Sequence, residues 1–446
     1  MDNVFYRNLN RSYLEIDRGE GIYLYDTHGN RYIDACAGAA VANLGHAHPR
    51  IIEAMVQQAN KVVFSHLSRW TSAPIKELAD LVAKLAPGSL NKLYLVSGGS
   101  EATEAALKMA RQYFLERDGK SGKYRIISRW KSFHGNTIGA LSMTGDKRRK
   151  KYVPLLLDFP HIAPAYCYRC PFEKKQENCS VECALDLERV VKMEGAENVA
   201  AFIAESVGGA ACGAIVPPAD YFKIIRQICD HYDILLIDDE VMAGFGRTGT
   251  MFSIEDWEVI PDLICVAKGM SAGYAPLGGV IAQEEIYNTF KQGSGSFVHG
   301  HTYGGNPLSA AVAVAVVKTL VDDGLVANSR LVGAYLLREL KEKLSPFWYV
   351  GDVRGKGMML GVELVKDKVT KEPFLVSLGV AEKLTQTLIK HGVIVYPGTG
   401  NADGENGDQF LLAPPLTMTI QQAEELVAAM VAGFAEFEKK IAFMKY

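Results

Sequence analysis

Residues 235–241 read Leu-Leu-Ile-Asp-Asp-Glu-Val, and residues 263–268 read Leu-Ile-Cys-Val-Ala-Lys. In each segment a short apolar run leads to charged residues, which is typical of a strand buried in a parallel sheet. We therefore expect the acid pair Asp238 and Asp239, and Lys268, to lie at the same, C-terminal, edge of one sheet, where open α/β sheets bind their ligands. A buried lysine beside a buried carboxylate indicates Schiff-base chemistry on a cofactor with a protonated ring nitrogen.

Composition limits the classes of protein to consider. The chain has 446 residues, of which 48% are hydrophobic, so one large domain or two medium-sized domains are expected. A net charge of −3 gives no electrostatic argument for nucleic acid as a partner, and the basic run at residues 147–151 is interpreted as a solvated loop. The N-terminus does not read as a signal peptide, and no apolar stretch is long enough to span a membrane. We therefore expect a soluble cytoplasmic protein without a membrane partner.

A second motif, Ser-Gly-Gly-Ser-Glu-Ala at residues 97–102, lies between a predicted strand and a predicted helix. This arrangement is typical of anion binding, because glycine allows close approach and the N–H groups of the first helical turn face the anion. Ser100 is also a plausible N-cap, and an ordinary tight turn is the alternative interpretation. Further along, Phe133 follows another predicted strand, where its ring could stack on a planar cofactor.

The order of the predicted elements suggests two unequal domains. Strands and helices alternate up to about residue 320, with one strand predicted at 199–204. From residue 324 charged amphipathic helices alternate with strands predicted at 358–365, 393–396 and 410–412. Residues 20–34 are predicted to form a β-hairpin. We predict a small domain built from both termini, residues 1–60 and 324–446, and a large domain at residues 61–323 with a cysteine-rich excursion at 165–185.

Together these motifs resemble the class III aminotransferases, pyridoxal 5′-phosphate enzymes of fold type I. The most specific piece is Asp-Glu-Val-x2-Gly-Phe-Gly-Arg-Thr-Gly at residues 239–249, followed by Lys268 and Gly269. The resemblance extends from Gly-His-Ala-His-Pro at 45–49 to Ala-Pro-Pro-Leu-Thr at 413–417. It implies an α/β fold in which helices flank a mostly parallel, seven-stranded sheet in the large domain, with a smaller α+β domain beside it.

The resemblance also implies a role for each motif. Lys268 would form the Schiff base with the cofactor and move the proton, and Asp239 would pair with the pyridinium nitrogen. Asp239 is preferred over Asp238, whose position varies in the family. The other implied cofactor-binding residues are Gly99, Ser100, Phe133, His134, Val241 and Thr302. Thr302 would come from the neighbouring subunit, which implies an obligate homodimer, with a tetramer as an alternative.

Two departures from the family pattern bear on the substrate. Many members have a glutamine near the cofactor O3′ where this chain has Met242. Members that use α-amino acids carry an arginine for the α-carboxylate where this chain has Leu411, and the preceding loop, 398–409, contains no arginine. Glu205 aligns with the acid that would pair with that arginine; it could face a polar or cationic substrate group, or be an ordinary hydrogen-bonded acid.

We therefore expect an aminotransferase that moves an amino group from an ω- or β-amino acid or an amine to a keto acid, pyruvate or 2-oxoglutarate, by a ping-pong mechanism. Trp70 and Leu411 are expected near the substrate. Candidate partners for the acceptor carboxylate are Arg69, Arg247 and Arg354. The alternatives are an aminomutase or a decarboxylating transaminase on the same fold, and a non-catalytic cofactor-binding regulator.

Four cysteines are close together in the sequence: Cys167, Cys170, Cys179 and Cys183. Their thiolates could bind a structural zinc ion, and free thiols or a redox-dependent disulfide are the alternatives. No metal is predicted for the active site. The segment Cys-Tyr-Arg-Cys-Pro at 167–171 resembles an insert found in a subgroup of the family that prefers ω-amino acids. A protein whose function lies in this cysteine cluster is a further alternative.

Overall fold

The computed structural model describes residues 3–119 and 122–442. Among these residues the largest sheet has seven strands, in the order β4-β10-β9-β8-β7-β5-β6. Strand β10 is antiparallel to β4 and β9, and the remaining neighbours are parallel. The strands are β4 (Leu90–Val96), β5 (Arg125–Arg129), β6 (His161–Ile162), β7 (Val199–Ala204), β8 (Leu235–Asp239), β9 (Leu263–Val266) and β10 (Gly278–Gln283). The predicted mostly parallel, seven-stranded sheet is confirmed.

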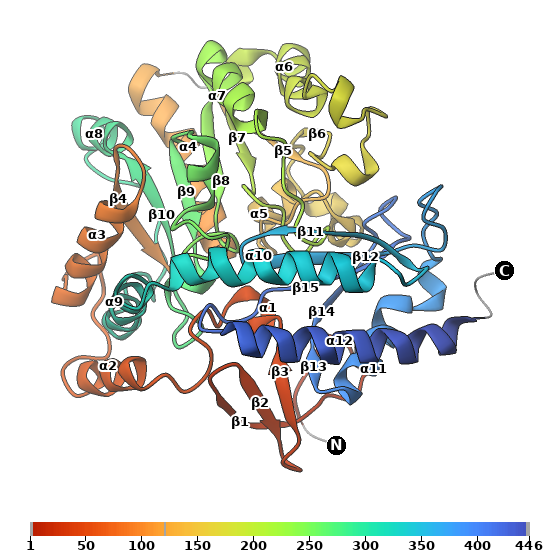
Figure 1. The fold of residues 1–446 in the computed structure, drawn as a ribbon. Helices are drawn as coiled ribbons and strands as arrows, with labels where there is room; N and C mark the ends of the chain where they lie inside the picture. Colours follow the sequence, from red (N-terminus) through yellow and green to blue (C-terminus); the bar gives the residue numbers. More distant parts are fainter. Residues whose placement is uncertain (1–2, 120–121, 443–446) are drawn as a thin grey trace.

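Helices cover both faces of this sheet (Figure 1). Ile237 of β8 packs in one apolar cluster with Ala105 of α4, whereas Leu236 packs in another with Phe222 of α7. Successive side chains of a strand point to opposite faces, so α4 and α7 lie on opposite sides of the sheet. The helices around the sheet are α4 (Gly99–Asp118), α5 (Ile138–Met143), α6 (Glu182–Glu194), α7 (Tyr221–Tyr232) and α8 (Glu284–Gln292).

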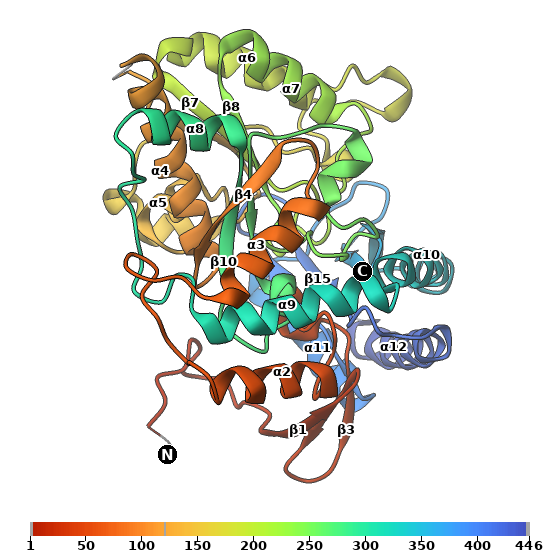
Figure 2. The same ribbon diagram turned by 90° about the vertical axis from the view of Figure 1, so that its left-hand side faces the viewer.

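Three further helices form a group that contacts the sheet through α3, at β4. Helix α9 packs against both α2 and α3, and α3 packs against β4 (Figure 2). Their bounds are α2 (Pro49–Ala59), α3 (Ala73–Leu85) and α9 (Pro307–Asp322), and a short helix, α1 (Ala37–Ala40), precedes them. No helix within residues 3–119 and 122–442 is long and apolar enough to cross a membrane.

The two ends of the chain share one sheet. Within the described ranges, β1, β2 and β3 form a four-stranded sheet with β13, in which Ile33 pairs in parallel with Val393. A second four-stranded sheet has the order β11-β12-β15-β14. The strands are β1 (Ile16–Glu20), β2 (Tyr23–Asp26), β3 (Arg31–Asp34), β11 (Val350–Lys356), β12 (Met359–Leu364), β13 (Val393–Ile394), β14 (Tyr396–Thr399) and β15 (Asp408–Leu412).

Helices α10 (Leu325–Leu344), α11 (Val380–Lys390) and α12 (Ile420–Ile441) pack around these smaller sheets, and α10 lies beside α12 in both views (Figures 1 and 2). The structure differs from the prediction at residues 393–396, which form parts of two strands in different sheets. Strand β11 was not expected, because its sequence, Val-Gly-Asp-Val-Arg-Gly-Lys, lacks a continuous apolar alternation. The domain boundaries at residues 60 and 323 stay a prediction.

Candidate active site

Asp239 and Lys268 lie at one edge of the large sheet, as predicted. Strands β8 and β9 are parallel neighbours, so the last residue of β8, Asp239, meets the chain that continues from β9 to Lys268. Both side chains line a cavity of about 190 Å³. The other lining residues are Gly99, Ser100, Phe133, His134, Gly135, Asn136, Glu205, Ala210, Val241 and Met242. Tertiary structure therefore gathers residues from five separate stretches of sequence around one lysine.

The alternation of β8 decides which acid faces this cavity. Asp239 has the same parity as Ile237 and projects on the side of α4, whereas Asp238 shares the parity of Leu236. Asp238 is fully buried, and its pKa is raised well above the usual value by burial and by the neighbouring carboxyl of Glu240. Of these two neighbouring acids, only Asp239 lines the cavity.

His134 holds the carboxylate of Asp239. Its Nδ1 lies 2.7 Å from Oδ2 of Asp239, while Oδ1 accepts a hydrogen bond of 3.1 Å from the backbone N–H of Val241. The backbone of His134 is fixed in turn, because its N–H donates to Thr144 and its carbonyl accepts from Thr103. The ring nitrogen Nε2 is buried without a hydrogen-bond partner among the described residues. The sequence grouped His134 with the cofactor-binding residues, and the structure places its ring against Asp239.

Lys268 has the properties of a reactive amine. Burial lowers its pKa to about 8, although the nearby carboxylates of Asp239 and Glu205 partly oppose this effect. Its backbone has a φ of 34°, a left-handed conformation that residues with a side chain rarely adopt and that is concentrated at functional sites. A lysine with a lowered pKa is more often neutral near neutral pH and is therefore a better nucleophile.

Glu205 closes one side of the cavity as a hydrogen-bonded acid. Its two carboxyl oxygens accept from the backbone N–H groups of Gly209, at 2.9 Å, and Phe133, at 3.3 Å. Burial raises its pKa. These bonds fix the Phe133 loop and the turn after β7 relative to each other. Glu205 thus lines the predicted site. Its hydrogen bonds within the chain agree with the interpretation of an ordinary hydrogen-bonded acid.

The start of α4 forms a tight cradle next to Lys268. A Cβ on Gly99 would lie 2.7 Å from Cγ1 of Val241, and a Cβ on Gly135 would lie 2.6 Å from Oγ of Ser100. The expectation that Ser100 is the N-cap is wrong: Gly98 holds that position, and Oγ of Ser100 instead accepts from the N–H of Asn136 at 3.1 Å. No side chain caps α4, so its first N–H groups stay open to an anion.

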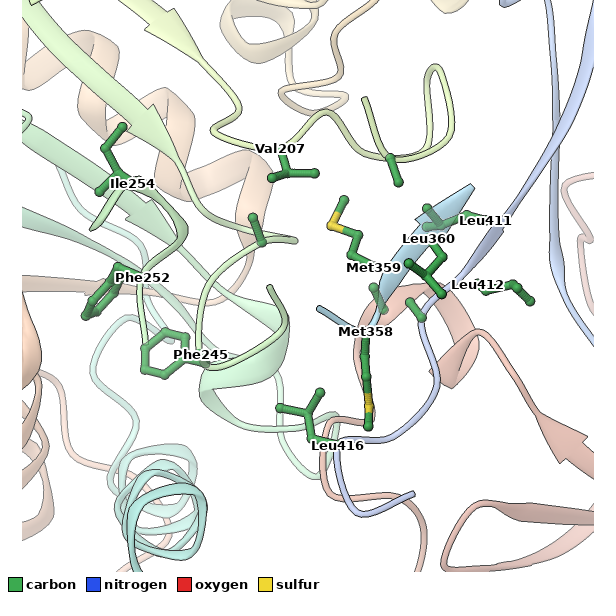
Figure 3. Packing of buried hydrophobic residues seen from close by; sticks show 14 of the residues in the cluster. Val207, Phe245, Phe252, Ile254, Met358, Met359, Leu360, Leu411, Leu412 and Leu416 are labelled. Carbon is green, nitrogen blue, oxygen red and sulfur yellow. The ribbon is translucent and has the colours of Figure 1, made fainter. Parts of the chain in front are cut away.

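Three predicted site residues do not line this cavity in the single chain. Thr302 and Trp70 are exposed, in segments joined by an edge-to-face contact between Phe64 and Tyr303. Leu411 is fully buried on β15, in the apolar cluster that contains Leu360 (Figure 3). Leu411 therefore contributes to the hydrophobic core, and its contact with substrate stays a prediction.

The three candidate arginines are not free in the cavity either. Arg247 is fully buried; its guanidinium donates to the carbonyls of Pro414 and Met358 and to the side chain of Asn43. Arg354 donates to the carbonyl of Gly213 at 2.8 Å and pairs with Glu363, while Arg69 is exposed. Arg247 and Arg354 thus link distant segments of the chain.

A different arginine, Arg148, packs against a wall of the cavity. The guanidinium carbon of Arg148 is 4.6 Å from the ring centroid of Phe133, which lines the cavity of Lys268. The sequence did not predict this position, because residues 147–151 were interpreted as a solvated loop. Helix α5 is short, so the chain returns after it to the same sheet edge. The short distance in sequence between Phe133 and the basic run at residues 147–151 was the one sign that these residues could lie together.

The four clustered cysteines lie outside this site. They occupy η3 (Cys167–Arg169), the following loop and the start of α6, and all four are free thiols. Among the residues that the structure describes, no group of three or more His, Cys, Asp or Glu side chains is arranged to hold a metal ion.

Comparison with known proteins identifies the family. The family model "Aminotransferase class-III" matches residues 5–433. The uncharacterized aminotransferase YodT of Bacillus subtilis is 38% identical over 435 residues, with 97% of each chain covered. Putrescine–pyruvate aminotransferase of Pseudomonas aeruginosa is 36% identical, with 95% of this chain and 91% of that one covered.

Solved structures of transaminases have the same fold as this chain. An (S)-enantioselective omega-transaminase from Thermomicrobium roseum superposes with a TM-score of 0.90 at 37% identity, with 97% of this chain and 96% of that one covered. A PLP-bound amine transaminase from an uncultivated Pseudomonas species gives a TM-score of 0.92 at 34% identity, with 98% and 99% of the chains covered. The chain therefore belongs to the class III aminotransferases and is a pyridoxal-phosphate-dependent enzyme of fold type I.

Proposed function

We propose that this aminotransferase takes its amino group from an ω- or β-amino acid or an amine and gives it to pyruvate or 2-oxoglutarate in a ping-pong reaction. The observation that carries the proposal is Leu411, which stands where α-amino-acid members have their arginine and is fully buried among apolar side chains. A bidentate partner for a carboxylate next to the reacting carbon is therefore missing at that position.

The cavity residues fit pyridoxal phosphate. The open N-terminus of α4 and the close approach at Gly99 suit its phosphate, and the buried carboxylate of Asp239 suits a protonated ring nitrogen. Val241 and Phe133, which both line the cavity, suit the two faces of the ring. Lys268, which lines the same cavity, would hold the cofactor through Nζ. When bound, pyridoxal phosphate accepts the electron pair that remains after a proton leaves the donor carbon.

The chain's own residues then do the remaining work. Nζ of Lys268 takes the proton from the amine-bearing carbon, a task that suits a base whose pKa is about 8. Asp239 turns its carboxylate toward the cofactor ring, and His134 fixes the orientation of that carboxylate. The donor leaves as an aldehyde or ketone before the keto acid binds, which gives ping-pong kinetics.

Two relatives support this range of donors without fixing the substrate of this chain. One is named putrescine–pyruvate aminotransferase, and another, 35% identical from Oryza sativa subsp. indica, is named probable gamma-aminobutyrate transaminase 3. In both names the amino group belongs to an amine or an ω-amino acid. The subunit arrangement, with Thr302 completing the phosphate site of a neighbouring subunit in a homodimer, is part of the same proposal.

A donor panel tests the proposal. L-alanine, β-alanine, taurine, 4-aminobutyrate and 1-phenylethylamine are each assayed with pyruvate and with 2-oxoglutarate. We expect turnover with at least one of the last four donors at a higher kcat/KM than with an α-amino acid. A clear preference for an α-amino acid would contradict the argument from Leu411. Turnover without any keto acid would indicate an aminomutase instead.

A further inference from the structure

A second cavity adjoins the cavity of Lys268. Its volume is about 520 Å³, and Ala210 lines both cavities. Its walls come from three segments: residues 130–153, which follow β5, residues 210–212, and the loop of residues 397–404 that begins in β14. The two cavities therefore share a wall at Ala210.

This second cavity is strongly basic. Its lining contains five cationic side chains among the described residues: Lys131, Lys147, Arg148, Arg149 and Lys150. Two carboxylates oppose them, and one of these, Asp403, already accepts from the backbone N–H groups of Glu405 and Asn406. The whole chain has a net charge of −3, so the positive charge of this cavity is opposite in sign to the net charge of the chain.

Most of these cations are occupied in building the walls. Lys131 donates to the carbonyl of Ala402 at 2.6 Å, Lys150 donates to that of Gly404 at 3.3 Å, and Lys147 contacts Thr399. These bonds tie the basic segment to the loop of residues 397–404. Nη1 of Arg149 lies 3.0 Å from Nε2 of His161, and its guanidinium lies over the ring of Trp130.

Arg148 differs from the others. Its guanidinium lies over the ring of Phe133, and its Nη1 pairs with Asp146. Nε and Nη2 donate to no atom of the residues that the structure describes. Asp146 also accepts from the backbone N–H of Arg148 at 2.7 Å, which fixes the start of the arginine's own segment. Arg148 is thus held in place at the boundary between the two cavities with donors to spare.

We propose that Arg148 binds a fixed anionic group of the donor substrate: a carboxylate, sulfonate or phosphate separated from the amine by a spacer. This rests on the proposed function, whose substrate class it narrows. The planar guanidinium can form two parallel hydrogen bonds to such an anion, and partial burial strengthens them. The spacer is required because the anion lies beyond Phe133 and Ala210 while the amine reacts at Lys268.

The test compares matched donors that differ only in the anion. The pairs are β-alanine with propylamine, 4-aminobutyrate with butylamine and 6-aminohexanoate with hexylamine; taurine and phosphoethanolamine add the sulfonate and phosphate arms. We expect the wild type to prefer the anionic member of at least one pair. Arg148→Met should lower kcat/KM for that member about 10–100-fold and change the uncharged amine less than about twofold. Arg148→Lys should retain part of the preference.

Lys151→Met is the matched control, because Lys151 belongs to the same basic run, is exposed and does not line the cavity. It removes the same charge and should leave the preference unchanged. Binding of unreactive butanoate, hexanoate and methyl phosphate, measured by calorimetry on the holoenzyme, gives a readout independent of turnover. Binding of the preferred anion should weaken in Arg148→Met and not in Lys151→Met.

The anion whose binding and turnover depend most on Arg148 identifies the group that the cavity recognises. Equal losses for both members of every pair, or no loss in Arg148→Met, would overturn the proposal, because the basic segment would then be a solvated face. Absence of transamination by the wild type with every donor, charged or not, would instead contradict the proposed function.

Discussion

Oδ2 of Asp239 lies 2.7 Å from Nδ1 of His134, and both side chains are buried. The carboxylate also accepts from the backbone of Val241, so its position does not depend on a ligand. A preorganised charge of this kind costs no reorganisation when the reaction occurs. The acid next to it in sequence, Asp238, is also buried but points to the other face of the sheet.

This difference between neighbouring acids gives the first prediction. Asp239→Asn should lower kcat at least about 100-fold, because the amide cannot supply the negative charge toward the cofactor ring. Asp238→Asn should change kcat less than about threefold, since the raised pKa of Asp238 favours the neutral form of this carboxyl and an amide is a near-isosteric neutral group. Steady-state kinetics measure kcat of the two variants. Equal losses of kcat would contradict the choice of Asp239 over Asp238.

Replacing Lys268 is the second prediction. Lys268→Ala should abolish turnover and the borohydride-sensitive visible absorbance of the bound cofactor, because the side-chain nitrogen is the group expected to hold it. Lys268→Arg serves as a control that preserves charge and length without a nucleophilic amine, and it should show the same two losses. A variant that kept both properties would refute the role of this lysine.

The third prediction concerns the pH dependence of stability. Burial raises the pKa of Glu240 to about 7, so the folded chain keeps a proton that the unfolded chain releases above its ordinary value of about 4.5. The folded state therefore loses stability as the pH rises between these two values. Glu240→Gln removes this proton release, while its amide oxygen can still accept from the N–H of Ile254.

We expect Tm of the wild type to fall more than Tm of Glu240→Gln between about pH 5 and about pH 8, by the equivalent of a few kcal/mol at most. Thermal unfolding at both pH values measures this difference. A smaller fall in the wild type than in the variant would contradict the raised pKa.

The cradle at α4 gives a fourth prediction. Gly99→Ala places a Cβ against the stiff side chain of Val241, so we expect it to weaken cofactor binding about tenfold and to lower Tm. Gly98→Ala is the matched control, because Gly98 has an extended backbone and its Cβ would meet no atom within 4 Å. Titration of the two apoenzymes with pyridoxal phosphate measures both effects; a larger defect in Gly98→Ala would be the contrary result.

Arg247 supplies the fifth prediction. Arg247→Met should destabilise the fold by about 2–5 kcal/mol, because it leaves the carbonyls of Pro414 and Met358 without their buried donor. The KM for keto acids should stay within about twofold, since Arg247 is fully buried and does not line the cavity. Thermal unfolding and acceptor kinetics measure the two effects separately, and a raised KM at unchanged Tm would favour a role in substrate binding.

The local pattern of the chain predicted much of the fold. Apolar runs at 235–239 and 263–266 became adjacent parallel strands, and the strand predicted at 199–204 has those bounds in the structure. Elements whose sequence lacks a clear hydrophobic period were missed or misplaced. Strand β11, which contains two glycines and three charged residues, was not predicted, and the strand expected at 393–396 divides between two sheets. Such strands are defined by their neighbours and not by their own sequence.

The site, too, has a part that the sequence predicted and a part that it did not. Gly99, Ser100, Phe133, His134, Asp239, Val241 and Lys268 meet at one cavity, because each follows or starts an element at the same sheet edge. Their chemical roles stay predictions. The arginines could not be ranked from the sequence, since a buried guanidinium and one at a cavity read alike until their partners are known.

By itself, the sequence determined the family, the mostly parallel sheet and the cofactor, and it favoured Asp239 as the acid beside Lys268. The strands follow from short apolar runs, whereas the family, the cofactor and the preference for Asp239 follow from the resemblance carried by the motif at residues 239–249 and Lys268. Only the tertiary structure decided that Arg247 is a buried link, that His134 holds Asp239 and that Arg148 returns to Phe133. Contacts between residues distant in the chain depend on how the elements pack, and no local pattern records them.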